Sequence, residues 1–486
     1  MSTPITHLTD FSDKLSPMLV KELRQGMRAK TFIAVFLSLQ IFLAVMLFSA
    51  SATSTSDHVG SVVSGIIFTF FATAVLLVQP LRGIGALSSE VKGNTIDMMV
   101  LTRLSAWRIV FGKWVAIVSQ SALLLSTIIP YLILRYFFGG MNLVAELTIL
   151  IVMFLTSMAL TAFTVGLSGC SSIIVRALLP IFGLPILLWT MAVGFVFRSF
   201  RGSSGFMDVF ALDSTDSRIA MAVYVASITY LGGSMLSLGT SLIAPAAENH
   251  ALVRRLVALG ALLILLPLGY LQKIDDALVY IMTIVIAVPA IVIALTESAP
   301  LVATVCKPFV KRGILGKAIG YLLYPTWASG ILFAILIGLI GLALFFSQMM
   351  LHGSVNSWNR EASIVTLALF GGLFFPAAWQ AFLFRGEGQR IGHYLLLLVG
   401  SGVMLGILTA LSESMDNGLF LWFFAWNPLA FLAMLTDHKT DKDVLLGAVA
   451  IVDALLLILL ITRALIEIRK SAPVIQEVEN AMKTPD

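Results

Sequence analysis

Charged residues are scarce in this chain of 486 residues, and their scarcity excludes a water-soluble protein. Only 12% of the residues are charged, whereas 59% are hydrophobic and the mean hydropathy is +0.98. So few polar groups cannot cover a soluble surface, and apolar runs long enough to cross a bilayer recur along the chain. We therefore predict an all-α polytopic membrane protein.

Cysteine, histidine and nucleotide-binding motifs are also sparse, and each shortage removes a class of chemistry. The two cysteines, Cys170 and Cys306, are expected in cytoplasmic loops, so neither a disulfide nor a metal site is predicted. The six histidines are scattered, and no HExxH or GxSxG motif occurs. The nearest run to a phosphate-binding GxxxxGK[ST] loop, residues 313–318, is too short and lacks the hydroxyl that holds magnesium. We expect this chain not to be an enzyme and to bind no cofactor or metal itself.

Twelve apolar runs of about 17–25 residues have the length that a bilayer of roughly 30 Å demands. Most of the 31 Lys and Arg residues fall before the first run, after the last and in alternate loops, which predicts cytoplasmic termini and a location in the inner or plasma membrane. The net charge of +5 has the same origin and does not predict nucleic-acid binding. The expected spans are Phe32–Ala50, Val62–Val78, Trp114–Leu134, Leu147–Leu167, Ala177–Phe197, Ile219–Ile243, Leu256–Leu271, Ala277–Leu295, Trp327–Phe346, Ala362–Phe384, Ile391–Ala410 and Val444–Ile461.

Two other segments are expected to lie along the membrane surface. Residues 1–31 contain an amphipathic helix that starts near Pro17, which is either an interfacial elbow or a charged flank of the first span. Residues 419–434 are apolar and aromatic, but Asn427 and Pro428 interrupt them. The sequence therefore predicts a re-entrant or interfacial segment on the outer side, before the last span.

A weak internal repeat indicates two six-helix halves. Ala86-Leu87-Ser88-Ser89-Glu90 closes the second expected span and Ala294-Leu295-Thr296-Glu297 closes the eighth, and a basic stretch follows each. Coincidence is the alternative, since helix ends at a membrane face often carry Ser, Thr and Glu. The predicted domains are the elbow 1–31, a first half 32–245 with a coupling segment 81–114, a second half 246–470 with a cytoplasmic segment 297–326, and a tail 471–486.

The segment 81–114 combines charge with helix punctuation between two apolar runs. Asn94 can cap a short amphipathic helix that includes Met99, and Ser105 can cap the following span. Because the short helix cannot cross a bilayer, we expect it at the membrane surface.

This segment resembles the cytoplasmic segment of type-two ABC transporter permeases, and the N-terminal run PMLVKELRQGMRAKTF resembles the elbow of that family. The family pattern is a Glu, a Gly-Thr pair, paired large apolar residues, Thr-Pro-Leu-Ser and a closing Gly-Lys. Two departures occur, since Asn94 is inserted before Thr95 and Arg103 replaces the usual proline. The matching residues are Glu90, Gly93, Thr95, Met98, Met99, Thr102, Leu104, Ser105, Gly112 and Lys113.

The resemblance implies the transmembrane subunit of an exporter, whose coupling helix in this segment docks on a separate ATPase subunit. ATP and magnesium then bind to that partner rather than to this chain. Membrane lipids and a second permease chain are further candidate partners. The substrate, and whether one chain supplies both halves, stay open.

Asp453, near the middle of the last expected span, supports a second hypothesis. A charge within a span is costly and is kept mainly where it binds an ion or a proton, so an ion-coupled secondary transporter would use this residue. Alternatively, the carboxyl is hydrogen-bonded to a neighbouring helix, a role also expected for Gln40 and Gln120. A membrane scaffold or sensor without transport is the third hypothesis.

Overall fold

The computed structural model describes most of the chain, and within the described residues every regular element is a helix. Ten of these helices are long and apolar enough to cross a membrane, and a bent pair at the N-terminus raises the number to eleven if it counts as one span. An all-α polytopic protein is thus confirmed. The number twelve stays a prediction, since most of Ala177–Phe197 lies outside the described residues. The described stretches are 17–52, 67–93, 105–136, 143–170, 172–185, 210–270, 276–351, 357–383, 390–415, 418–435 and 441–483.

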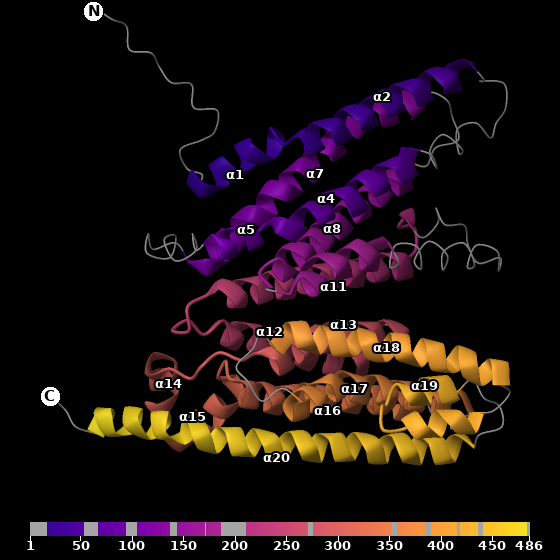
Figure 1. Cartoon of the computed structure of the whole chain (residues 1–486). Coiled ribbons are helices and arrows are strands. Elements are labelled where there is room, and N and C mark those ends of the chain that lie inside the picture. Colours follow the sequence, from indigo (N-terminus) through magenta and orange to yellow (C-terminus); the bar gives the residue numbers. More distant parts are fainter. Residues whose placement is uncertain are drawn as a thin grey trace, which may run out of the picture. The chain divides into compact units, whose positions relative to one another are not determined.

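The helices form two compact units (Figure 1). Unit 1 comprises Met1–Gly169 and Arg176–Ile243, and unit 2 comprises Cys170–Val175 and Ala244–Asp486. The main boundary, between Ile243 and Ala244, lies close to residue 245, the predicted end of the first half. Six spans in each half stay a prediction.

Unit 1 begins with a bent helix pair, because the axis turns by 55° between Leu19–Met27 and Lys30–Met46. A helix is therefore present where the elbow is expected, while its place at a membrane surface stays a prediction. The described long helices of unit 1 are α1 (Pro17–Met27), α2 (Lys30–Ala52), a composite helix (Ile67–Lys92), α7 (Ala106–Tyr136), α8 (Leu143–Leu167) and α11 (Thr215–Ile243). The composite helix includes four short segments: η1 (Thr73–Val78), α4 (Gln79–Leu81), η2 (Arg82–Gly85) and α5 (Ser88–Lys92). A further short helix, η3 (Ile174–Leu178), has residues of both units.

The composite helix is irregular around Pro80, which has no N–H and crowds the preceding turn. The chain is π-helical before this proline and 3-10 helical after it, so the regular ladder of backbone bonds is interrupted. Two hydroxyls of α8 bind carbonyl groups in this region: Ser157 Oγ donates to the Val75 carbonyl at 2.7 Å, and Thr164 Oγ1 donates to the Pro80 carbonyl at 2.6 Å. Satisfying such carbonyls from a neighbouring helix allows an irregular helix to persist in an apolar environment.

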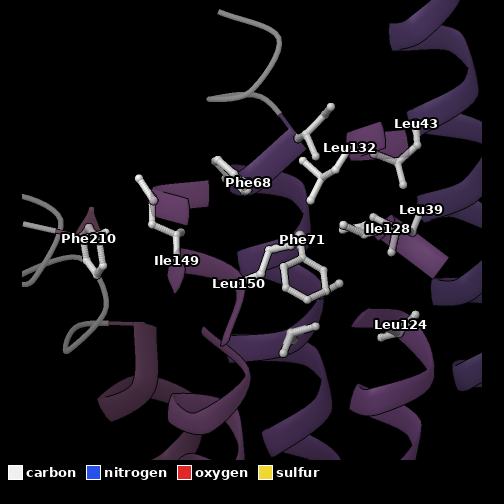
Figure 2. Close-up of a cluster of buried hydrophobic side chains, with 14 of the residues drawn as sticks. Leu39, Leu43, Phe68, Phe71, Leu124, Ile128, Leu132, Ile149, Leu150 and Phe210 are labelled. Carbon is white, nitrogen blue, oxygen red and sulfur yellow. The ribbon is translucent and has the colours of Figure 1, made fainter. Parts of the chain in front are cut away.

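The core of unit 1 is a cluster of aliphatic and aromatic side chains from α2, the composite helix, α7 and α8 (Figure 2). Leu43, Phe71, Leu124 and Ile128 in this cluster are fully buried. Lipid tails are as apolar as these side chains, so close van der Waals packing, rather than escape from water, holds the helices together within a bilayer.

Unit 2 packs its helices equally closely. A Cβ atom at Gly330 of α16 would lie 1.9 Å from the Ala294 carbonyl oxygen of α13, so only glycine permits this approach. The helices of unit 2 are α12 (His250–Tyr270), α13 (Asp276–Thr296), α14 (Ala303–Val310), α15 (Gly313–Leu323), α16 (Trp327–Leu351), α17 (Ser357–Leu383), α18 (Arg390–Met415), η4 (Gly418–Phe424), α19 (Ala430–Met434) and α20 (Lys442–Lys483).

The apolar segment before α20 is broken, as the sequence predicts. The helices η4 and α19 are each too short to cross a bilayer, and a turn that includes Asn427 and Pro428 separates them. The Asn427 carbonyl accepts the Ala430 N–H at 2.9 Å, and Asn427 Oδ1 accepts the Leu429 N–H at 3.2 Å. On which side of a membrane this segment lies stays a prediction.

The last helix is much longer than the expected span Val444–Ile461. With 42 residues, α20 is about 63 Å long, roughly twice the thickness of a hydrocarbon core. It continues as helix through most of the residues assigned to the tail, and Ile475 and Val478 pack against α14 and α15. The C-terminal part of α20 is thus a structural part of unit 2.

Candidate functional site

Lys113 of α7 lies between two carboxylates at one end of unit 1. Its Nζ is 2.8 Å from Glu90 Oε1 of α5 and 3.1 Å from Glu22 Oε1 of α1. The side chain of Lys113 is 8% exposed and those of Glu90 and Glu22 are 13% and 18% exposed. The ammonium group therefore links α1, α5 and α7, of which the last two flank the predicted coupling helix in the sequence.

The structure places the expected docking residues unevenly. It joins Glu90 to Lys113, and Gly93 and Ser105 flank the gap, with α7 starting directly after Ser105. Gly112 lies on α7, where an added Cβ atom would meet no atom within 4 Å. The remaining expected residues, outside the described part of the chain, are Thr95, Met98, Met99, Thr102 and Leu104.

A second polar cluster of unit 1 centres on Arg82, a residue for which the sequence predicts no role. Its guanidinium donates to Gln120 Oε1 on α7 and to Gln79 Oε1 at 3.1 Å, and it lies over the Phe32 ring at 5.9 Å. The helix contact expected for Gln120 is thus confirmed, as is that for Gln40, whose Oε1 accepts the Tyr131 hydroxyl at 2.8 Å. The sequence does contain a signal for this cluster, because Arg82 is a charged residue within an otherwise apolar run.

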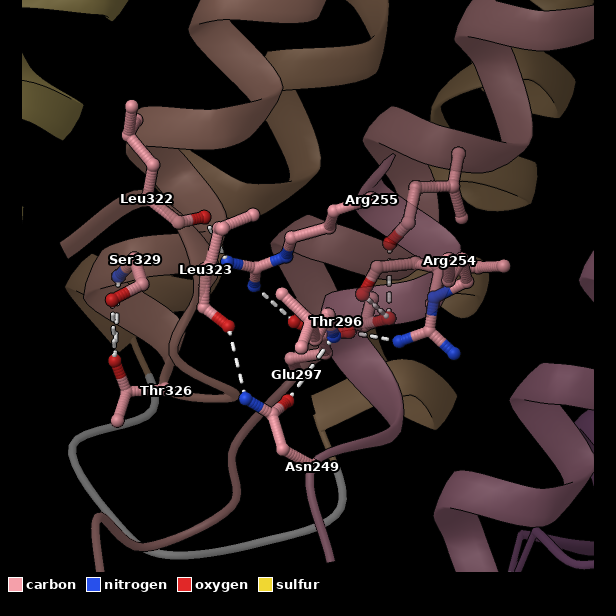
Figure 3. Close-up of polar contacts among 12 residues, drawn as sticks. Asn249, Arg254, Arg255, Thr296, Glu297, Leu322, Leu323, Thr326 and Ser329 are labelled. Atoms are coloured by element: carbon pink, nitrogen blue, oxygen red, sulfur yellow. Dashed lines mark hydrogen bonds and ion pairs between the residues drawn. The ribbon is translucent and has the colours of Figure 1, made fainter. Parts of the chain in front are cut away.

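In unit 2 a buried ion-pair cluster lies where α12 begins and α13 ends (Figure 3). Glu297, directly after α13, accepts one hydrogen bond from Arg254 and another from Arg255. All three side chains are at least nine-tenths buried, and the Arg255 guanidinium lies over the Phe333 ring at 5.3 Å. Two guanidinium groups thus share one carboxylate away from solvent.

The same cluster caps the C-terminus of α15. The last carbonyl groups of a helix lack intrahelical donors and carry partial negative charge. Arg255 Nη1 donates to the Leu322 carbonyl at 2.5 Å, and Asn249 Nδ2 donates to the Leu323 carbonyl at 3.3 Å. Asn249 Oδ1 also accepts the Leu252 N–H at 3.1 Å and so caps the N-terminus of α12. The two helices are therefore joined end to end by hydrogen bonds (Figure 3).

The short helices α14 and α15, here called the α14–α15 hairpin, have one buried and one exposed face. The buried face packs against α20 and includes Cys306, which lies within α14 and not in the expected loop. Burial raises the pKa of the Cys306 thiol, so the reactive thiolate is disfavoured. Lys317 Nζ of α15 is 2.5 Å from Glu479 Oε2 of α20. The hairpin is thus attached to the last helix by both apolar and ionic contacts.

Asp453 is 4% exposed and lies against Gly371 of α17, where an added Cβ atom would come within 1.8 Å of its Oδ1. The same Cβ position is 2.7 Å from Cγ of Pro428, in the broken segment. Neither carboxyl oxygen has a hydrogen-bond partner among the described residues. The expected hydrogen bond to a neighbouring helix is therefore not found in this part of the chain, because the facing surface offers glycine and proline rather than a donor.

Comparison with protein-family models, curated proteins and solved structures finds no match. Three buried features are therefore candidates on their own geometry: the Lys113 cluster in unit 1, and in unit 2 the Glu297 cluster with the attached hairpin, and Asp453.

Sequence patterns point to Glu90, Lys113 and Glu297 but not to the other members of the two clusters, Glu22, Arg254 and Arg255. The repeat marks both glutamates as ends of spans, and each is ion-paired in the structure. Arg254 and Arg255 directly precede the apolar run Leu256–Leu271, so antiparallel packing of that run with the next brings them to Glu297. This cluster could have been predicted from a pair of basic residues at the start of one span and an acidic residue at the end of the next.

Proposed function

We propose that this chain is the transmembrane permease subunit of an ATP-binding cassette transporter that works as an exporter. A separate ATPase subunit docks on two cytoplasmic elements, the coupling helix within 94–104 and the α14–α15 hairpin. ATP binding and hydrolysis then move the spans between inward-open and outward-open states. The membrane is the inner or plasma membrane, with both termini in the cytoplasm. The proposal starts from the resemblance of segment 81–114 to such permeases.

The exposed face of α15 provides most of the structural support for docking of an ATPase subunit on the hairpin. Ile314 and Leu315 are 86% and 78% exposed although the opposite face of the hairpin is buried against α20. An amphipathic helix with an exposed apolar face suits a groove on a protein partner. Lys307, Lys311 and Arg312 are also exposed, which favours a partner with acidic groups at the rim of its groove.

The contacts behind that face provide a route for motion. The C-terminus of α15 is bound through Arg255 and Asn249 to the start of α12, and Arg255 is paired with Glu297 at the end of α13. Lys317 and the apolar core connect the hairpin to α20. Buried hydrogen bonds and ion pairs resist separation, so a displaced hairpin would carry the ends of α12, α13 and α20 with it.

The experiment that tests docking replaces Ile314 and Leu315 together with Asp. Because a charge on this face would have to be desolvated on docking, we expect loss of ATPase binding in pull-down and of substrate-stimulated ATP hydrolysis. Met482→Asp is the control for an added carboxylate, since it introduces one such charge at a partly exposed apolar position at the end of α20. Membrane insertion and helical content should be unchanged in both variants.

A docking role is refuted if the double variant retains the ATPase at the wild-type level with transport intact. The competing role for this face is anchoring to anionic lipid headgroups, which its apolar and basic residues also suit. In that case the variant would lose affinity for anionic vesicles but keep the ATPase.

Asp453 favours a second candidate function, an ion-coupled secondary transporter. A buried carboxyl without a hydrogen-bond partner among the described residues is expected to carry a proton or to meet a cation. Asp453→Asn preserves shape but cannot ionise. Flux that follows an imposed pH gradient, ignores ATP and disappears in this variant would place the secondary transporter first. Unchanged ATP-driven flux in the variant would exclude it.

A further inference from the structure

A cavity of about 270 Å³ lies among α13, α16 and α17 of unit 2. Its lining, drawn from the described residues, is apolar apart from the hydroxyl-bearing Tyr280, Thr283 and Thr366, and includes no charged residue. A cavity with such a lining favours an apolar ligand, because the ligand supplies contact atoms that the walls otherwise lack.

The cavity is narrow and runs along the helices. Its lining on α13 extends from Tyr280 to Ile291, which is about 16 Å at 1.5 Å per residue. A volume of about 270 Å³ over that length corresponds to the width of one hydrocarbon chain. Gly341 of α16 lines the cavity without a side chain, and a Cβ atom there would lie at an ordinary contact distance of 3.5 Å from its nearest neighbour, the Thr283 methyl group.

The hydroxyl groups lie toward the end at which α13 and α17 begin. The Thr366 hydroxyl donates to the Ala362 carbonyl at 2.7 Å, and the Tyr280 hydroxyl lies 3.1 Å from Thr366 Oγ1. Because the single proton of Thr366 is engaged, Tyr280 is the donor in that pair. Thr283 likewise donates to the Val279 carbonyl at 2.8 Å.

These bonds determine what a ligand must offer. Each hydroxyl has one proton, and all three protons are already directed at protein acceptors, so only oxygen lone pairs remain for a ligand. A matching head group must therefore donate a hydrogen bond. It must also be uncharged, because no carboxylate lines the cavity to balance a cation.

We propose that this cavity binds one uncharged amphiphile, with a hydroxyl head that donates to the Tyr280 oxygen and a single apolar chain that lies along α13. The site does not rest on the proposed transport function. A resident membrane lipid and a compound that enters from outside share this chemistry, and the experiment separates them.

The test uses the full-length chain in lipid nanodiscs with a photoreactive fatty alcohol and the methyl ether of the same compound. The ether keeps the chain but cannot donate, so wild-type protein should bind the alcohol roughly fivefold more tightly, as expected for about one hydrogen bond. Tyr280→Phe keeps the ring and removes the acceptor. It should lower alcohol affinity to that of the ether and leave ether affinity unchanged.

Two filling variants locate the site. Gly341→Phe should abolish labelling of α13 and α16 by the probe, whereas Gly447→Phe, on α20 where an added Cβ atom meets nothing within 4 Å, should not. If Gly341→Phe fails to fold, the affinities of the alcohol and the ether for wild type and for Tyr280→Phe still test the proposal. Equal affinity of alcohol and ether for wild type, or undiminished labelling of folded Gly341→Phe, overturns the proposal.

Lipid extraction distinguishes the two sources. A hydroxyl-bearing amphiphile that co-purifies with wild type and not with Gly341→Phe identifies a resident lipid. Probe binding to wild type from which no such lipid is extracted identifies an exchangeable ligand, and both results uphold the site.

Discussion

Glu90 of unit 1 and Glu297 of unit 2 end the two stretches of the predicted sequence repeat, yet they are neutralised in opposite ways. In unit 1, one ammonium group, that of Lys113, lies between two carboxylates. In unit 2, one carboxylate lies between two guanidinium groups. Lys113 comes from α7, the next long helix after Glu90 in the chain, whereas Arg254 and Arg255 come from α12, the helix before α13, which Glu297 directly follows.

The Lys113 cluster of unit 1 and the Glu297 cluster of unit 2 are expected to differ in rigidity. An ammonium on a flexible stem is a point charge that can reorient between carboxylates, whereas a planar guanidinium has fixed donor directions. Arg255 uses these directions to bind Glu297 and the Leu322 carbonyl together, so it constrains two elements at once. We therefore expect the unit 2 cluster to be stiffer and more costly to break than the unit 1 cluster.

The largest effect is expected for Glu297→Gln, which leaves two buried guanidinium groups without their carboxylate. Removing one partner of a buried ion pair costs about 3–5 kcal/mol, so the free energy of unfolding should fall by about that amount. Denaturant titration of the purified protein in detergent measures it. Glu467→Gln is the control, because Glu467 forms an exposed pair with Lys470 and should change little. A loss below about 1 kcal/mol would contradict the predicted stiffness of this cluster.

An intermediate effect is expected for Lys113→Met, which leaves Glu22 and Glu90 close together. These carboxylates keep some solvent contact, so the predicted loss is about 2–3 kcal/mol. Glu90→Gln should cost only about 1 kcal/mol because Lys113 retains Glu22. The same titration checks both. If Glu90→Gln proved as damaging as Glu297→Gln, the contrast between the units would disappear.

The smallest effect is expected for Lys317→Gln in the α14–α15 hairpin. Its pair with Glu479 is about a third exposed, so its removal should cost less than about 1 kcal/mol and the cost should shrink as salt is added. Unfolding titrations at low and high salt measure this. A large loss that does not depend on salt would instead make this pair the principal attachment of the hairpin to α20.

Much of the fold could be predicted from composition and run length. Apolar runs of bilayer length become helices because every backbone group must be bonded within the run. Asn427 and Pro428 correctly mark the broken segment before α20. The length of α20 was harder to predict, because its final turns are polar enough to look like a tail and are helical where α14 and α15 cover one face.

The candidate site was predicted only in part. Glu90 and Lys113 were identified by resemblance, but Glu22 was not, since no local pattern says which carboxylate of an amphipathic helix will face a distant lysine. Asp453 stands out in the sequence as a charge within a span. The sequence does not show that Asp453 faces Gly371 and Pro428, which offer its carboxyl no hydrogen-bond donor. This arrangement depends on how α17 and the broken segment pack on α20.

By itself, the sequence determined that this is a multi-pass helical membrane protein, because hydropathy and backbone hydrogen bonding act locally along each run. Tertiary structure alone decided which charges meet, what caps α15 and where a cavity remains. These features join residues that are far apart in the chain, and each depends on rotations and close approaches of whole helices. Hydrophobic periodicity does not encode those rotations, since in a bilayer both lipid-facing and buried surfaces are apolar.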